Sequence, residues 1–113
     1  MADVLERASV VLVNTNATDV FQVPNTTGDE RALVIGLNIC NVSANPATLI
    51  VSIVASGGST IARMAHQESV AANSRRELID GNGKLVLKAG ERLRAAASIG
   101  NAFEVTASYV LSS

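Results

Sequence analysis

The sequence predicts an all-β fold, an antiparallel β-sandwich or jelly roll of about eight strands. Short segments along the whole chain alternate between large apolar residues and small or polar ones, which is the period of two that a half-buried strand shows. Clusters of Gly, Asn, Ser and Pro separate these segments, as turns do. No segment keeps the 3.6-residue period of an amphipathic helix, so no long helix is expected.

The chain has the size and composition of one globular domain. It has 113 residues, of which 48% are hydrophobic and 17% charged, so it can bury a core without a disulfide or a metal. Residues 1–18 are expected to form an N-terminal arm or a first strand, and residues 19–113 a β-sandwich domain. The net charge of −1 gives no field that would hold nucleic acid, so nucleic acid is not expected as a partner.

Short strands are expected at residues 9–14 and 20–23, and the next two strands carry a stronger pattern. Within residues 31–41 the odd positions from Leu33 to Ile39 are large and apolar, and the same parity returns in residues 48–55. Because only residues 42–46 separate the two strands, they are predicted to form an antiparallel hairpin. The side chains expected to face the core are Leu33, Ile35, Leu37, Ile39, Leu49, Val51, Ile53 and Ala55.

The middle of the chain has weaker patterns. Residues 60–67 are expected to form a further strand or a short helical turn, and residues 74–79 a weak strand. Residues 80–83, with two glycines and an asparagine, favour a tight turn before a short strand at residues 84–87.

The last two strands are predicted at residues 92–99 and 102–111. The dipeptide Gly100-Asn101 lies between them, which predicts a second antiparallel hairpin. The side chains expected to face the core are Leu93, Ala95, Ala97, Ile99, Phe103, Val105, Ala107, Tyr109 and Leu111.

The N-terminal residues, the length of the apolar runs and the single cysteine indicate in which cellular compartment the protein is made. The first residues are acidic and precede an apolar run of six residues, which is not the pattern of a signal peptide. No apolar run approaches the length of a membrane span, so soluble cytoplasmic synthesis and no membrane partner are expected. The single cysteine, Cys40, lies in an apolar strand and is expected to be a small buried thiol.

Candidate catalytic residues are few. His66 is the one histidine, and no nucleophile-elbow sequence accompanies it, so a strand or turn histidine is the favoured interpretation. Cys40 and His66 supply only two of the four ligands of a structural zinc. We therefore expect no enzyme, no metal and no cofactor.

Two groups of residues are candidates for contacts with partners. Arg75, Arg76, Arg92 and Arg94 would form one basic stripe if their strands were neighbours, either as a solvated strand face or as guanidinium groups that meet carboxylates of another subunit. Apolar residues also occupy strand positions expected to face outward, which favours burial in a homo-oligomer or a larger assembly. These are Val34, Ile50, Val54, Val86, Ala96 and Val110.

Several stretches of residues 20–111 carry a family pattern. They are Phe21-Gln22-Val23-Pro24, the strand Ala32 to Asn41 with its Cys-Asn end, Thr48 to Ala55 with Gly57-Gly58, Val70-Ala71-Ala72-Asn73, and Leu85-Val86-Leu87-Lys88-Ala89-Gly90-Glu91-Arg92-Leu93-Arg94. Together they resemble small β-sandwich virion structural proteins of tailed bacteriophages, of the decoration, neck or tail type. Glu91 stands where the family more often has Asp, and the loop after Gly58 is short.

The resemblance implies a structural protein of a phage virion, located in the particle. Its favoured role is capsid decoration, or cement: a homo-oligomer, often a trimer at such sites, that binds the major capsid protein or other virion proteins and bridges subunits. Residues 2–18 are then a candidate docking arm, ordered on binding. The alternative is a neck, tail or fibre domain that binds a host surface ligand through residues 14–19 and 56–60.

Overall fold

Nine strands and their connecting loops make up residues 3–79 and 85–112, the part of the chain that the computed structural model describes. The strands are β1 (Val4–Leu12), β2 (Thr18–Gln22), β3 (Arg31–Asn41), β4 (Ala47–Val54), β5 (Thr60–Val70), β6 (Arg75–Ile79), β7 (Leu85–Lys88), β8 (Arg92–Ala97) and β9 (Phe103–Ser112). These residues contain no helix, and so none that could cross a membrane. The turn predicted at residues 80–83 lies outside the described residues.

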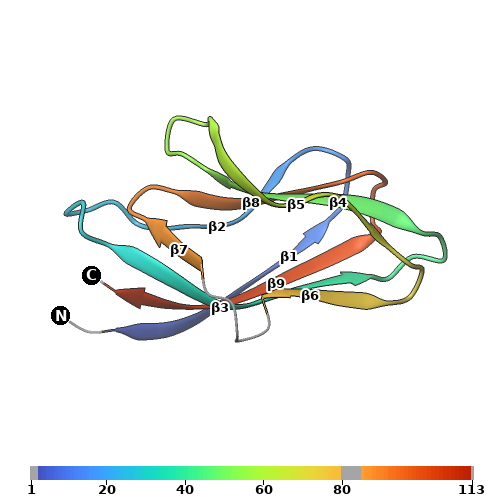
Figure 1. Ribbon diagram of the computed structural model, residues 1–113, viewed down its shortest axis with the longest axis horizontal. Coiled ribbons are helices and arrows are strands. Elements are labelled where there is room, and N and C mark those ends of the chain that lie inside the picture. Colours follow the sequence, from blue (N-terminus) through green and yellow to red (C-terminus); the bar gives the residue numbers. More distant parts are fainter. Residues whose placement is uncertain (1–2, 80–84, 113) are drawn as a thin grey trace.

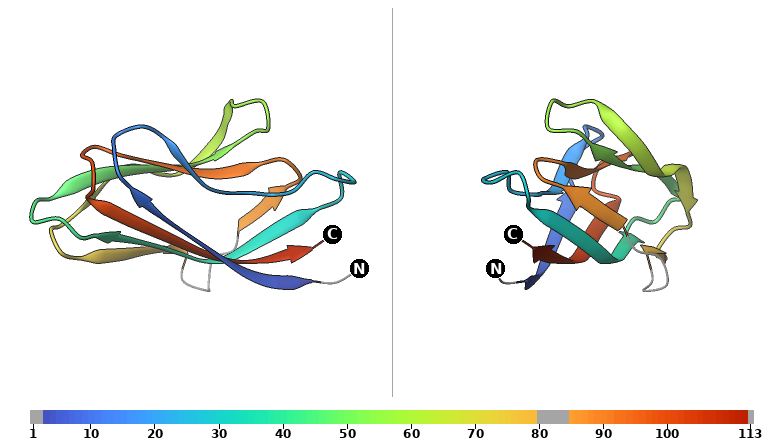
Figure 2. Two further views of the ribbon diagram at one scale, coloured as in Figure 1. Left: turned by 180° about the vertical axis from the view of Figure 1, so that it is seen from behind. Right: turned by 60° about the vertical axis from the view of Figure 1, so that its left-hand side comes forward.

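The strands form two antiparallel sheets packed face to face (Figure 1). Sheet A has the order β1-β9-β3-β6, with β7 also paired to β3, and sheet B has the order β2-β8-β4-β5. The two layers are seen from the side in Figure 2. In this order the first strand pairs with the last, the second with the last but one, and so inward to β4 and β5, which is the jelly-roll arrangement.

This topology makes both predicted hairpins wrong. β3 lies in sheet A and β4 in sheet B, and likewise β9 lies in sheet A and β8 in sheet B. Each of these consecutive pairs is joined by an arch between the sheets, whereas the consecutive strands β4 and β5 do form a hairpin. A short loop of Gly, Asn and Ser serves an arch as well as a hairpin, and the alternation of the strands is the same in both cases.

A bulge in β3 changes which side chains face the core. The register of β3 against β9 shifts between Val34 and Gly36, so the residue between them, Ile35, is the extra one. The even positions are buried before the bulge and the odd positions after it. The predicted inward positions Leu37 and Ile39 are therefore confirmed, whereas Leu33 and Ile35 lie on the outer face.

The first strand is an integral part of the sandwich. β1 pairs with β9 along its whole length, and its last residue, Leu12, is fully buried. Ala8 and Val10 pack against the same core. Residues 4–12 thus form a first strand that is paired within the sandwich.

The core lies between the two sheets, and an aromatic pair joins them there. The rings of Phe21 on β2 and Tyr109 on β9 stack with their centroids 4.1 Å apart. Burial raises the pKa of the Tyr109 hydroxyl, and the charge of Glu6 on the neighbouring strand raises it further. The inward positions predicted for β8 and β9 are confirmed, except that Ile99 lies in a loop and is exposed.

Two buried polar side chains order the loops at opposite ends of β3. The Glu30 carboxylate accepts hydrogen bonds from the backbone N–H groups of Thr26, Thr27 and Gly28. The bond from Thr26, followed by those from Thr27, lowers the pKa of Glu30 from 4.5 to about 2. Asn41 is fully buried, and its amide bonds the β3–β4 loop to the end of β5.

Candidate functional site

Four of the seven predicted contact residues meet on the outer face of sheet B. In the register of β4 and β8, Val54 lies opposite Arg92, and Ile50 lies opposite Ala96, with the pair Ser52 and Arg94 between them. The odd positions of both strands face the core, so these even positions share the outer face. The prediction that Ile50 and Val54 point away from the core is thus confirmed by the register.

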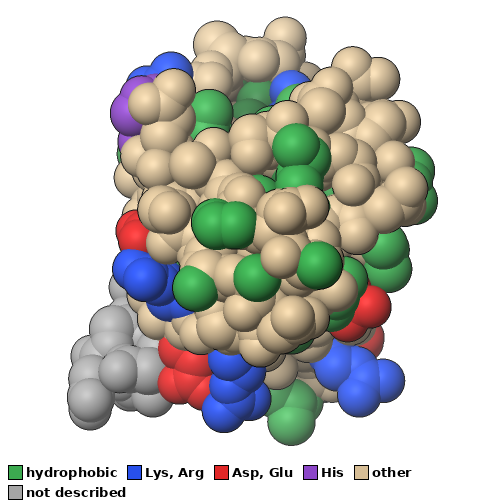
Figure 3. All heavy atoms as spheres, turned by 90° about the vertical axis from the view of Figure 1, so that its right-hand side faces the viewer, with side chains coloured by type: hydrophobic (Ala, Val, Ile, Leu, Met, Phe, Trp, Pro, Cys, Tyr) green, Lys and Arg blue, Asp and Glu red, His purple; other side chains and the backbone are tan. Residues whose placement is uncertain are grey.

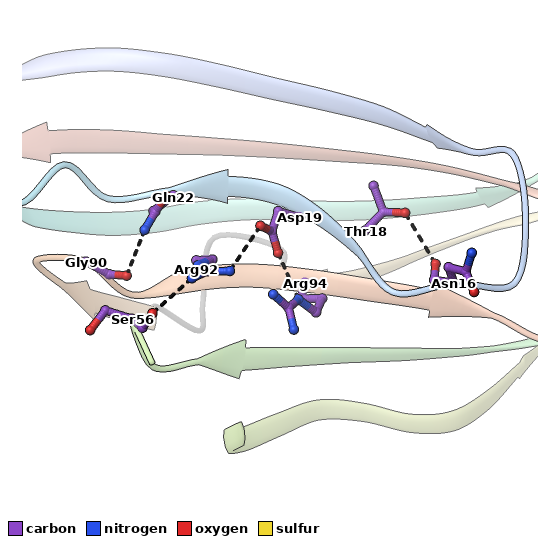
Figure 4. Close-up of polar contacts among 8 residues, drawn as sticks. All are labelled: Asn16, Thr18, Asp19, Gln22, Ser56, Gly90, Arg92 and Arg94. Carbon is purple, nitrogen blue, oxygen red and sulfur yellow. Dashed lines mark hydrogen bonds and ion pairs between the residues drawn. The ribbon is translucent and has the colours of Figure 1, made fainter. Parts of the chain in front are cut away.

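Asp19 of β2 holds the two arginines of this face together (Figure 4). Its carboxylate accepts a hydrogen bond from Nε of Arg94 at 2.8 Å and lies 3.5 Å from a guanidinium nitrogen of Arg92. Arg92 also donates to the backbone oxygen of Ser56 at 2.9 Å. One carboxylate between two guanidinium groups leaves the cluster with one positive charge, which favours an anionic or carbonyl-rich contact.

A shallow hollow of about 170 Å³ lies beside this cluster. Ile50, Ser52 and Val54 form its floor, and Arg94 and Ala96 flank them. Its rim includes Ala17 from the β1–β2 loop and Thr60 from the start of β5. The two loops predicted for a host ligand, residues 14–19 and 56–60, therefore border one hollow, and Arg92 links their ends through Asp19 and Ser56.

Two of the apolar residues predicted to need an oligomer for their burial are already buried in the single chain. Val54 is only 1% exposed within the single chain, so its burial needs no second subunit. Val34 is fully buried in the core between the sheets, because the bulge of β3 places it on the inner face. Val34 is therefore not available to a partner.

The predicted single basic stripe does not form. Arg75 and Arg76 belong to β6 in sheet A, whereas Arg92 and Arg94 belong to β8 in sheet B. Arg76 pairs with Glu68 of β5, which ties the edges of the two sheets together, and Arg75 lies 3.8 Å from Glu77 on its own strand. All four arginines thus face carboxylates of the same chain, and the pair on β6 is well exposed.

A second surface, which sequence reasoning missed, is the end of the sandwich at the right of Figure 1. Four loops meet there, at residues 13–17, 42–46, 71–74 and 98–101, and none of their residues is charged. Figure 3 views the molecule from this end, and its charged side chains lie toward the margins. We call this surface the uncharged end. Its exposed aliphatic side chains are Val13 (61%), Val42 (46%) and Ile99 (38%).

Backbone hydrogen bonds fix the loops of the uncharged end to one another. Asn101 N–H donates to the Leu12 oxygen at 2.9 Å, and Val42 N–H donates to the Ala102 oxygen at 2.7 Å. Asn73 N–H donates to the Ser43 oxygen at 3.2 Å. The sequence signal that was available is the absence of charge from every arch at this end, but only the topology brings those arches together.

His66 and Cys40, the candidate catalytic residues and zinc ligands, lie in different sheets. His66 is exposed on β5, and Cys40 is half-buried on the outer face of β3, opposite Glu104, so the prediction of a buried thiol is wrong. In residues 3–79 and 85–112 no three His, Cys, Asp or Glu side chains lie close enough together to hold a metal ion.

The fold has counterparts among solved structures, although no family model and no curated protein sequence matches the chain. A structure of the infectious bursal disease virus T13 particle matches with a TM-score of 0.58 and 10% identity over 96% of this chain, which spans only 30% of the viral chain. The protein of Bacillus endospore appendages, disulfide-linked pili, matches with a TM-score of 0.57 and 11% identity over 96% of this chain and 86% of that one.

A third counterpart has nearly the same length as this chain. The capsid structure of Helicobacter pylori bacteriophage KHP30 contains a chain that matches with a TM-score of 0.52 and 11% identity, over 98% of this chain and 87% of that one. At these identities the likeness shows the fold alone. Such jelly rolls occur in capsid and pilus proteins, among others.

Proposed function

We propose that this protein is a structural component of a phage virion, and that it is a capsid decoration protein that binds the outer shell and bridges neighbouring subunits. The uncharged end carries this proposal. It combines three exposed aliphatic side chains with a surface depleted of charge, which is the composition of the buried centre of protein interfaces. The jelly-roll likeness to capsid proteins agrees with it at the level of fold.

The hydrogen bonds between the loops also favour binding at the uncharged end. A surface that is already ordered loses little conformational entropy when it binds, so more of the contact energy remains as affinity. The arches of the uncharged end are ordered by bonds to Leu12, Ala102 and Ser43. A small domain of this kind adds its binding energy to a shell only in the assembled state, which stabilises the shell by mass action.

The test introduces one charge into the uncharged end. Val42→Asp and Ile99→Asp should each abolish incorporation into particles, because a carboxylate buried without a partner is costly at an interface. Ile61→Asp is the matched control: Ile61 is 52% exposed on β5, away from this end. Quantitative mass spectrometry of purified virions gives the copy number, and hundreds of copies are expected for a shell protein. Full incorporation of both end variants would contradict the proposal.

The second candidate is a neck, tail or fibre domain that binds a host surface ligand. The observation that favours it is the hollow of sheet B, which residues 14–19 and 56–60 border and which Arg94 lines. For this role Arg94→Ala should lower adsorption of phage to cells while the protein stays in the particle. A handful of copies per virion, located at the tail by microscopy, would favour this role over decoration.

A further inference from the structure

Strand β1 forms one edge of sheet A, and it is the most regular edge in the described part of the chain. It pairs with β9 over all nine residues without a register shift. The other edges are short or broken. β2 and β6 have five residues each and β7 has four, and β5 changes register three times against β4. A long straight edge offers a row of backbone N–H and C=O groups to another strand.

The side of β1 that faces outward can be assigned. The carbonyl oxygen of Leu12 accepts its hydrogen bond from Asn101, which lies on the side of β9. Backbone groups of successive residues point to opposite sides of a strand, so those of the odd residues point to the open edge. The odd residues are Leu5, Arg7, Ser9 and Val11, and all four side chains are exposed on the outer face of sheet A.

We propose that a second copy of this chain pairs with β1 in antiparallel orientation about a two-fold axis at Ala8. The two A sheets then become one continuous sheet. This register pairs all nine residues of the strand, and it sets Leu5 opposite Val11 of the second copy and Arg7 opposite its Ser9. About eight backbone hydrogen bonds form between the odd residues.

Charge and side-chain type both select this register. It places no like charges opposite each other, because Arg7 meets Ser9 and Glu6 meets Val10. A slide by two residues one way sets Arg7 against Arg7 of the second copy. A slide the other way leaves Leu5, which is 71% exposed, beyond the end of the partner strand. In the proposed register Leu5 and Val11 cover each other.

The continuous face also gains an apolar row. Cross-strand pairing lines up Leu5, Val110, Leu33 and Val86 over β1, β9, β3 and β7 on the outer face of sheet A. Val11 of the second copy extends this row by one strand. Leu5 and Val86 are the most exposed members at present, with 71% and 54% of their surface accessible.

The size of the contact sets its strength. A nine-residue edge about 30 Å long and about 10 Å thick covers on the order of 300 Å² per copy, less than the roughly 800 Å² of a standard interface. The pair is therefore weak between free chains and becomes strong where copies are held close together. The contact is independent of the proposed function, because purified chains alone must form it.

A charge swap at Ser9 tests the register. Ser9→Arg sets Arg opposite Arg7 twice in the dimer, and Ser9→Glu sets Glu opposite Arg7 twice. The dimer dissociation constant, measured by sedimentation equilibrium up to millimolar concentration, should rise about tenfold in the first variant and fall about tenfold in the second. Arg7→Glu combined with Ser9→Arg should restore dimerisation. Equal effects of both charges on the dissociation constant would overturn the register.

Cross-linking detects the pair even if it is weak. Ala8→Cys in a Cys40→Ser background places two thiols at the two-fold axis, within the Cα separation of 4.4–6.8 Å that a disulfide needs. Mild oxidation should give a covalent dimer, whereas the control Ala62→Cys in the same background, exposed on β5, should not. Equal cross-linking of both variants, no dimer at any concentration, or a trimer would overturn the proposal, because a two-fold strand pair cannot close a trimer.

Discussion

Replacing Asn41 by alanine should destabilise the domain by about 3 kcal/mol, although the side chain has no part in the apolar core. Asn41 is fully buried. Its Nδ2 donates to the Asn45 oxygen at 2.9 Å and to the Val70 oxygen at 3.0 Å, and its Oδ1 accepts from the N–H and the hydroxyl of Ser43. Truncation leaves the buried Val70 oxygen without its donor, at about 2 kcal/mol, and water replaces the three half-buried bonds at a combined cost of about 1 kcal/mol.

Urea unfolding followed by circular dichroism measures this loss. A change of about 3 kcal/mol lowers the midpoint by about 2 M for a domain of this size. Asn45→Ala is the matched control and should change stability by less than about 0.5 kcal/mol, because Asn45 takes part in these hydrogen bonds only through its backbone oxygen and its backbone N–H. Asn41→Asp should be worse than Asn41→Ala at neutral pH, since a carboxylate cannot donate to two carbonyl oxygens, and should recover partly near about pH 3. A loss below about 1 kcal/mol for Asn41→Ala would refute the reasoning.

Three further predictions concern loops and the first strand. The pKa of Glu30 is lowered from 4.5 to about 2, so its stabilisation is complete above pH 4.5 and is lost as the pH falls through 2; the urea midpoint of the wild type should fall over that range more steeply than that of Glu30→Gln. Gly90 has φ +82° and its added Cβ would lie 3.1 Å from Ser56 Cβ, so Gly90→Ala should cost about 2 kcal/mol in urea unfolding, whereas Gly57→Ala should be nearly neutral. Deleting residues 2–12 should abolish cooperative thermal unfolding, because it removes Leu12 from the core and opens the edge of β9; a deletion variant that melts like the wild type would return residues 2–12 to the role of a docking arm.

The alternation of apolar residues predicted which residues are buried better than which strands pair. On β8 and β9 the inward positions, from Leu93 to Tyr109, follow directly from the period of two. The partner of each strand does not follow, because an arch and a hairpin need the same turn residues. The end of β8 at Ala97 and the start of β9 at Phe103 are separated by a loop that crosses between the sheets.

The bulge of β3 shows a second limit of sequence reasoning. Every position from Ala32 to Ile39 except Asn38 and Gly36 is apolar, so either parity fits a buried strand before the bulge. The fold resolves this by inserting Ile35, which leaves Val34 and Leu37 both facing the core. A strand apolar on both faces cannot reveal such a change of parity. For the same reason Leu33 was predicted to face the core, whereas Val86 and Val110 of the same outer-face row were predicted to face outward.

The candidate site was also predictable only in part. Parity predicted that Ile50, Val54, Arg92 and Arg94 face outward, whereas the pairing of β4 with β8, which was not predicted, brings them together. Arg75 and Arg76 were separated from them by a pairing that the sequence does not encode locally. The uncharged end depends on four loops spread over nearly ninety residues of the chain, so no local pattern could reveal it.

The lack of charge at the uncharged end has a simple structural cause, which by itself does not indicate an interface. Arches between sheets need residues that tolerate tight turns, and Asn, Ser and Gly meet this need without charge. Turn chemistry does not, however, require large aliphatic residues, and a β-branched side chain is a poor turn former. Val13, Val42 and Ile99 therefore have no local reason to be exposed there. If each were replaced by threonine, the fold should keep its stability, and any loss of incorporation into particles would come from the lost contact alone.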